Sequence, residues 1–321
     1  MTISSDSTAP LIAVVGSTGL QGGSVINNLA LSDKPYRIRG LTRDAKKDKA
    51  QALAKRGVEV WTVDLSADNA EGIQKAFQGA TYVFIMTNYW EHVDKARETA
   101  EGKTLVEAAQ KVGVELLLVS SAPNATKVSN GTLTKVYHFD SKAEIADHAR
   151  ALGVPFVDIH AAGYMNNFTT FSRPRPAGDG SYVVDGTWPE DMRMPLLDTY
   201  RDFGLFVQLA IESDEFNKGN GKIIWACGDQ VTLPDQVKDI STVTGKKIAY
   251  NRVTEEQSRA GMAQAGLPPF VVDDMIEMFE FHGVWNSAYA AGSHIEPAKL
   301  ARRPRTFKEY VENEDWSSVF V

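Results

Sequence analysis

The stretch Leu11–Asn28, LIAVVGSTGLQGGSVINN, decides the fold of this chain of 321 residues. Its first residues, Leu11–Val15, are all apolar and run directly into a glycine-rich turn. After the turn, Val25, Ile26 and Leu29 follow at helical spacing. This order predicts a buried strand, a tight loop and a helix, which together begin a βαβ unit of an α/β fold.

The glycines of the turn recur as Gly16-x-x-Gly19-x-x-Gly22. This spacing differs from G-x-G-x-x-G, but it meets the same needs: a turn without Cβ clashes, a close approach of the backbone to a pyrophosphate, and tight packing of the helix on its strand. The first helical N–H groups would then face the phosphates. We therefore expect a dinucleotide site rather than a plain glycine-rich turn, with contacts from Gly16, Thr18, Gly19, Leu20, Gln21 and Gly22.

The overall composition is that of an ordinary soluble globular protein, with 43% hydrophobic and 23% charged residues. The single cysteine, Cys227, excludes an intramolecular disulfide and a cysteine-rich zinc site, and the histidines lack the spacing of metal ligands. A net charge of −7 argues against direct binding of nucleic acid. We expect a protein of a reducing compartment, the cytoplasm, with the nucleus as an additional location.

Neither a targeting segment nor a membrane span is expected. Residues 1–10 are polar and lack an apolar core, so they are interpreted as a disordered leader and not as a signal or transit peptide. No run of about 18 apolar residues occurs along the chain. The expected partners are therefore a dinucleotide and either a small-molecule substrate or a protein, while the oligomeric state stays open.

The end of the second predicted strand indicates which dinucleotide is bound. Residues 36–42, YRIRGLT, form this strand, and Arg43 follows it about 20 residues beyond the last loop glycine. An acidic residue there binds the ribose 2′-OH of NAD, whereas an arginine can bind the 2′-phosphate of NADP. Arg43 therefore favours NADP(H) over NAD(H). Asp44 is the alternative residue for this position at the ribose, because a shift of the strand end by one residue would place it there and reverse the preference.

Further strands are predicted at residues 58–63, 81–86, 114–119 and 154–159, and they alternate with helices. Such repeats require a doubly wound parallel Rossmann sheet, whose ligands lie at the carboxyl ends of the strands. Asp64 has an alternative interpretation as the cap of the following helix. The residues that follow these strands are expected to contact the cofactor: Asp64, Leu65, Thr87, Asn88, Ser120 and Ser121.

The segment after the fifth strand carries candidate catalytic residues. Ser120 and Ser121, followed by Tyr137 to Lys142, YHFDSK, resemble the short-chain dehydrogenase/reductase arrangement. In that family a tyrosine gives a proton to the carbonyl oxygen, and a lysine four residues later holds the nicotinamide ribose. Here His138 stands four residues before Lys142, and Tyr137 lies about 100° further around the helix. Since imidazole can deliver a proton near neutral pH, Lys142 and His138 are the candidate catalytic pair.

Four motifs together resemble the NmrA-like group of atypical short-chain dehydrogenases: GSTGLQGGSV, LTRD, HFDSKAEIAD and IHAAGYMNNF. The resemblance covers nearly the whole chain and implies that Tyr164 and Asn166 also contact the cofactor. Members of this group divide in function. Some are NADP-binding regulators that bind transcription-factor partners with little or no turnover, and others, the isoflavone- and quinone-reductase relatives, transfer hydride with a lysine and without the tyrosine.

The expected architecture is a doubly wound parallel Rossmann sheet with a smaller mixed α/β C-terminal lobe. Residues 11–160, with residues 196–227 returning to them, would form the dinucleotide-binding domain, and residues 161–195 and 228–321 the lobe that meets a substrate or partner. The loop at 173–194 would cover the nicotinamide, and residues 195–213 are predicted as a helix. Aromatic residues could line a substrate pocket or belong to the core: Tyr89, Trp90, Phe168, Phe279 and Trp285.

Two functions remain open for such a chain. The sequence narrowly favours a sensor or regulator that responds to the redox state of the dinucleotide with little or no turnover, because His138 replaces the tyrosine proton donor. The alternative is an NADPH-dependent reductase that uses Lys142 on a small carbonyl, quinone, enone or imine substrate.

Overall fold

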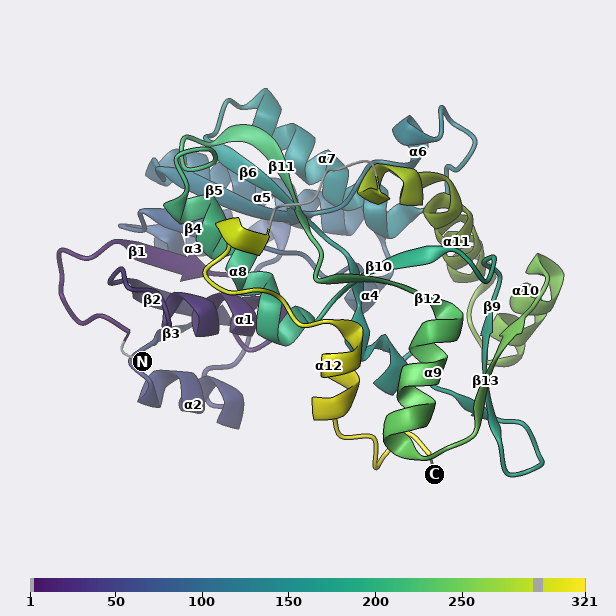
Figure 1. Cartoon of the computed structure of the whole chain (residues 1–321). Helices are drawn as coiled ribbons and strands as arrows, with labels where there is room; N and C mark the ends of the chain where they lie inside the picture. Colours follow the sequence, from purple (N-terminus) through teal and green to yellow (C-terminus); the bar gives the residue numbers. More distant parts are fainter. Residues whose placement is uncertain (1–2, 291–296, 321) are drawn as a thin grey trace.

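Seven parallel strands form the central sheet (Figure 1). The computed structural model describes residues 3–290 and 297–320, and for residues 284–290 it describes the backbone alone. The spatial order of the strands is β11-β6-β5-β4-β1-β2-β3, so the direction of winding reverses between β1 and β4. This sheet confirms the predicted doubly wound Rossmann fold, in which ligands bind where the order reverses. The strands are β1 (Leu11–Val14), β2 (Arg37–Thr42), β3 (Glu59–Thr62), β4 (Tyr82–Ile85), β5 (Leu116–Ser121), β6 (Phe156–Ala161) and β11 (Asn220–Ala226).

Helices cover both faces of this sheet because the strands are apolar on both faces. In β1, Ile12 and Val14 pack with one set of helices, whereas Leu11 and Ala13 pack with the other. The first set is α1 (Leu20–Leu29), α2 (Asp48–Lys55) and α8 (Thr199–Glu212). The second set is α3 (Ala70–Phe77), α5 (Lys95–Val112) and α7 (Tyr137–Ala151).

The remaining elements build a smaller lobe with a core of its own. Two three-stranded sheets, β12-β10-β7 and β13-β9-β8, lie beside the main sheet (Figure 1). Phe307 and Ile240 are fully buried in the lobe core. The strands are β7 (Gly163–Tyr164), β8 (Arg175–Pro176), β9 (Tyr182–Gly186), β10 (Arg193–Leu197), β12 (Asp229–Thr232) and β13 (Ile248–Arg252). The helices are α9 (Leu233–Thr244), α10 (Glu255–Gln264), α11 (Pro269–Ala290) and α12 (Phe307–Asn313), and the short helices α4 (Tyr89–His92) and α6 (Ala125–Val128) lie in loops of the Rossmann domain.

Three local expectations differ from the structure. Residues 195–197 belong to β10 and not to a helix, because α8 begins only after Asp198, whose side chain accepts a hydrogen bond from Arg201 N. The helix that the alternation predicts between β4 and β5, at residues 93–112, begins only at Lys95, since Val93 has a left-handed φ of 52° that ends α4. In the expected leader, Ile3 is buried in the hydrophobic core.

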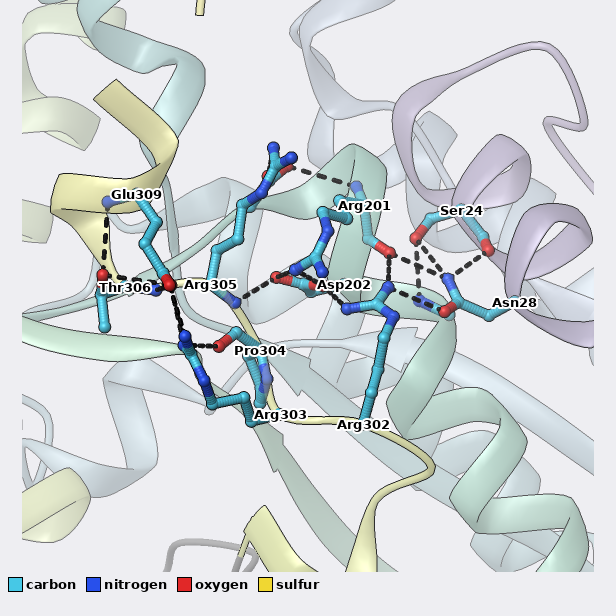
Figure 2. Close-up of polar contacts among 12 residues, drawn as sticks. Ser24, Asn28, Arg201, Asp202, Arg302, Arg303, Pro304, Arg305, Thr306 and Glu309 are labelled. Carbon is cyan, nitrogen blue, oxygen red and sulfur yellow. Dashed lines mark hydrogen bonds and ion pairs between the residues drawn. The ribbon is translucent and has the colours of Figure 1, made fainter. Parts of the chain in front are cut away.

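An arginine-rich segment, Arg302–Thr306, ties the C-terminal part of the chain to α1 and α8, and we call it the arginine strap. Figure 2 shows Arg302 bonded to the carboxylate of Asp202 and to Asn28, with a 3.0 Å bond from Arg302 Nη2 to Asn28 Oδ1. Asp202 is fully buried and also accepts hydrogen bonds from Arg201 Nη1 (3.0 Å) and Arg305 N (2.8 Å). The strap therefore supplies a cation, Arg302, to a buried carboxylate inside the Rossmann domain.

Within the described residues, none of the helices combines the length and the apolar character that a membrane crossing requires.

Candidate functional site

The glycine loop between β1 and α1 has the geometry of a phosphate cradle. Gly16 has a φ of +66°, and a Cβ on Gly22 would lie 2.3 Å from Gly16 O, so neither position accepts a larger residue without a shift of the backbone. The first turn of α1 has no side-chain cap and no acidic residue, which leaves its N–H groups available to an anion. A Cβ on Gly16 would meet only the flexible side chain of Met86, whose Sδ lies 2.9 Å away, so it is the left-handed φ that requires glycine here.

The other loop residues differ in exposure. Thr18 is half-buried, and Gly19 and Leu20 are exposed at the start of α1. Gln21 is buried, and its Nε2 donates to the hydroxyl of Tyr164 at 2.8 Å. Burial raises the pKa of Tyr164 to about 12. The buried Gln21 Oε1 has no hydrogen-bond partner, which is the state expected of an acceptor beside a ligand site. The residues present therefore fit a dinucleotide.

The carboxyl end of β2 offers cations next to the glycine loop. Thr18 and Thr42 line a surface hollow together with Lys47, Asp48 and Lys49. Arg43 is exposed and forms an ion pair with Glu91 of α4. The alternative residue, Asp44, accepts a hydrogen bond from Lys46 N at 2.8 Å in a local turn. Lys47 and Lys49 follow the strand by several residues, so no motif in the sequence predicts them at this hollow.

Asp64 and Leu65 follow β3. Asp64 is exposed, and its two oxygens accept hydrogen bonds from Ser66 N and Ser66 Oγ, both at 3.0 Å, which lower the pKa of its carboxyl. Asn69 precedes α3 as its N-cap residue, so the interpretation of Asp64 as the cap of that helix is wrong. Leu65 is half-buried against the core beside the sheet.

The tips of β4 and β5 bring further expected residues to the same edge. Thr87 is half-buried, and Asn88 is the exposed N-cap residue of α4. Ser120 and Ser121 are both buried, and Ser121 Oγ accepts a hydrogen bond from Ala122 N at 2.6 Å. Asn166 is half-buried in the lobe just after β7, with its carbonyl accepting from Thr169 Oγ1 at 2.9 Å.

Lys142 projects from α7 toward the tip of β4. Its ammonium group forms an ion pair with Glu98 of α5 and lies 3.4 Å from Thr87 O. The carboxylate of Glu98 is 3% exposed and also accepts a hydrogen bond from Ser141 Oγ. Lys142 therefore pairs with Glu98 and not with the neighbouring Asp140, whose carboxylate accepts hydrogen bonds from Thr126.

Glu98 was missed in the sequence, although a signal for it exists. It stands four residues before Gly102 and seven before Leu105, both of which are buried on the inner face of α5. A carboxylate on the buried stripe of a helix needs a partner, because an unpaired charge there is costly. Such a position indicates that a cation from a neighbouring element pairs with the carboxylate, as Lys142 does here.

His138 lies one helical turn before Lys142, on the same face of α7. Its Nδ1 is bonded to Oδ1 of Asp274, a fully buried carboxylate on α11. The rings of Tyr89 and Trp90 lie 5.9 and 5.0 Å from the imidazole, measured between centroids. Burial and the charge of Asp274 raise the pKa of the Tyr89 phenol. A histidine and a carboxylate thus meet in an aromatic enclosure beside the lysine.

The expected substrate residues divide into two that lie around His138, two that pack elsewhere and one whose side chain cannot be placed. Tyr89 is buried, whereas Trp90 is 43% exposed at the rim of the enclosure. Phe168 belongs to the lobe core, where it packs against Phe307, because its side of the 3₁₀ turn after β7 faces the lobe. Phe279 packs on Trp188 with ring centroids 4.9 Å apart. The side chain of Trp285 lies outside the described residues.

In the part of the chain that the structure describes, no three His, Cys, Asp or Glu side chains are grouped as metal ligands.

Comparison with known proteins gives consistent matches over nearly the full length. The model of the NmrA-like family matches residues 8–311. An NmrA-like oxidoreductase of Cladobotryum, FrzB, is 29% identical over 323 residues, which cover 92% of this chain and 90% of the relative. Another, cpsB of Aspergillus campestris, is 31% identical over 307 residues, covering 90% of this chain and 87% of the relative.

Solved structures share the fold at lower identity. The negative transcriptional regulator NmrA in complex with NAD has a TM-score of 0.73 at 23% identity, with 95% of both chains covered. An NADPH-dependent quinone oxidoreductase from Escherichia coli, solved with NADPH, has a TM-score of 0.70 at 21% identity and covers 94% of this chain and 98% of its own. These neighbours bind NAD or NADPH on the same fold.

Proposed function

The chain belongs to the NmrA-like family, and from this premise we propose that it is an NADP(H)-dependent reductase of a small carbonyl, quinone, enone or imine substrate. Support comes from FrzB and cpsB, which are named as oxidoreductases and match nine-tenths of this chain. Further support comes from the aromatic enclosure around His138, since a hydride acceptor needs a site that excludes water.

One observation carries the proposal: His138 and Lys142 lie one helical turn apart, and each is bonded to its own buried carboxylate. When bound, NADPH supplies the hydride. Lys142, beside Thr87 at the tip of β4, would orient the nicotinamide ribose. His138 would donate a proton to the substrate atom that gains negative charge. The buried Asp274 and Glu98 hold these two side chains in place.

We also propose that NADP(H) is preferred over NAD(H). A 2′-phosphate at the carboxyl end of β2 would meet Arg43 and Lys47, and a guanidinium binds phosphate through strong charge-assisted bonds. Asp44, which would repel the phosphate, is engaged in a local turn through Lys46 N. The proposed preference for NADP(H) thus rests on two cations, Arg43 and Lys47, at or near the hollow that Thr18 lines.

The second candidate function is the redox sensor. It is favoured by the exposure of Trp90, which is 43% exposed at the rim of the site and could meet a protein partner. In that function, dinucleotide binding would alter the surface formed by α4, and no chemical step would follow. In either function, the lobe made of residues 161–195 and 228–321 would meet the substrate or partner.

The deciding experiment is a screen of quinones, enones, imines and aldehydes for oxidation of NADPH. A reductase should turn over at least one of them faster than about 1 s⁻¹. Lys142→Ala should then lower kcat by about 100-fold, beyond its effect on cofactor binding, because the charge contributes more in the transition state than in the ground state. The control is Lys127→Ala, which removes an exposed lysine paired with Asp147 and should leave kcat unchanged.

Two results would contradict the proposal. Binding of NADPH without turnover of any compound would support the sensor, and Lys142→Ala would then weaken NADPH binding with no rate to lose. A Lys142→Ala protein that binds NADPH and turns over as the parent does would show that the lysine is not at the nicotinamide ribose.

A further inference from the structure

We propose that Asp274 is the positioning residue of the proton donor: it holds the Nδ1 side of His138, so that Nε2 delivers the proton to the substrate. This inference rests on the proposed reductase function and deepens it. Asp274 lies on α11 and His138 on α7, 136 residues apart in the chain. The two side chains therefore meet only when the smaller lobe is packed on the Rossmann domain.

The contact itself defines which ring nitrogen is free. Asp274 is fully buried, and its Oδ1 is the acceptor for Nδ1 of His138. A carboxylate can only accept at neutral pH, so the proton of this bond is carried by Nδ1. The hydrogen bond made by one imidazole nitrogen sets the role of the other. Nε2 is thus the nitrogen left to exchange a proton with a substrate.

Among the charged and titratable groups near His138, Asp274 is the one bonded to the imidazole. On α11, His282 is also near, and burial together with the charge of His138 lowers the pKa of His282 to about 4, so that this neighbour stays neutral. From α4, Tyr89 and Trp90 face the ring. Three further titratable side chains belong to the site: Glu98 on α5, and Lys142 and Tyr137 on α7. The charge of Glu98 is compensated by its ion pair with Lys142. Asp274 is therefore the carboxylate whose charge acts directly on the imidazole.

A separate set of contacts holds α11 against the loop that leads into α7. Asp273 Oδ2 accepts from Lys135 Nζ at 2.9 Å, and Asp273 Oδ1 accepts from Arg259 Nη1 at 2.7 Å. Glu277 Oε2 accepts from Lys135 N at 2.6 Å. Asp273 thus docks the helix, whereas its neighbour Asp274 meets the imidazole. This division of roles provides a matched pair of substitutions.

The proton transfer balances with the proposed reduction. The substrate carbon takes a hydride from NADPH, the electron pair of its C=O or C=N bond moves to the oxygen or nitrogen, and that atom takes the Nε2 proton of the His138 imidazolium. The products are the alcohol or amine, NADP⁺ and a neutral imidazole whose Nδ1 proton stays on the bond to Asp274. His138 then regains a proton from solvent, which completes the cycle.

The first test needs neither substrate nor cofactor. The ring protonation of His138 is followed by NMR against pH in the parent chain, with the His138→Gln variant to assign the signal. In Asp274→Asn the imidazole should become protonated about one pH unit lower, because the nearby negative charge is gone. Asp273→Asn should titrate as the parent does. If Asp274→Asn also titrates as the parent does, the proposal is overturned.

The second test uses turnover. A general acid works only while protonated, so kcat should fall as the pH rises through its titration. In Asp274→Asn this fall should move to lower pH, with the KM for NADPH within about twofold of the parent, whereas Asp273→Asn should keep the parent profile. An unmoved profile in Asp274→Asn overturns the proposal. A shifted NMR titration without turnover in any variant would leave the His138–Asp274 pairing intact and contradict the reductase function instead.

Discussion

At the scale of single residues, Arg43 allows a direct test of cofactor preference. Its guanidinium is 75% exposed and bonded to Glu91, so it can turn to a 2′-phosphate at little cost. Arg43→Ala should weaken NADP⁺ binding about tenfold and leave NAD⁺ binding unchanged, because only NADP⁺ carries the phosphate. Isothermal titration calorimetry with both dinucleotides measures this difference.

The control for that prediction is Arg56→Ala. Arg56 is an exposed arginine that donates to Asn27 Oδ1 at 2.8 Å, at the end of α2 away from the hollow. The Arg56→Ala variant should bind NAD⁺ and NADP⁺ with the affinities of the parent. Glu91→Gln should strengthen NADP⁺ binding by freeing Arg43. Equal losses for NAD⁺ and NADP⁺ in Arg43→Ala would contradict recognition of the phosphate.

The sequence predicted some residues of the site and not others, for a physical reason. Lys142 and His138 were found because four residues make one helical turn, a spacing visible within a single segment. Their carboxylate partners were not found, since Glu98 and Asp274 stand 44 and 136 residues away. Pairing across such separations depends on how elements pack, which local periodicity does not report.

At the scale of elements, the crossing of α1 and α8 depends on a glycine. A Cβ on Gly204 would lie 2.2 Å from Ser24 O, and Gly204 N donates to Ser24 Oγ at 2.9 Å. Gly204→Ala should push α8 away from α1 and lower the free energy of unfolding by about 1–3 kcal/mol, a typical cost of overpacking. It should also weaken NADPH binding, because α1 carries the phosphate cradle. Urea unfolding and calorimetry measure the two effects.

Gly261 of α10 is the matched control for Gly204. An added Cβ at Gly261 would meet no atom within 4 Å. Gly261→Ala should therefore raise the free energy of unfolding by about 0.5–1 kcal/mol through helix propensity alone. A Gly204→Ala protein as stable as the parent would show that the two helices can separate without cost.

Elements of the main sheet were predictable because their apolar runs and glycine turns recur with a regular period. Residues 195–197 were not, since the apolar residues around them fit a helix as well as a strand, and only pairing with β12 and β7 decides for β10. Strands β12 and β13 are short and half-exposed, so they lack the apolar signal of the main sheet.

At the scale of the whole molecule, the arginine strap joins the C-terminal part to the Rossmann domain. Arg302→Met should lower the free energy of unfolding by about 3 kcal/mol, because it leaves the fully buried Asp202 with less compensation. Arg303→Met, which removes a 62% exposed arginine paired with Glu309, should cost less than about 1 kcal/mol. Thermal and urea unfolding compare the two variants, and equal losses would contradict a role for burial.

The strap also has a consequence for the order in which the chain can be completed during synthesis. Arg302 donates a hydrogen bond to Asn28, which stands 274 residues earlier in the chain. The first helix of the Rossmann domain therefore lacks this contact until the ribosome has nearly finished the chain. At about 5–20 residues per second, this delay lasts from some 14 seconds to nearly a minute. Asp202 is made 100 residues before Arg302, so for about 5–20 seconds at the end of this interval its carboxylate lacks a cation that neutralises it in the finished protein.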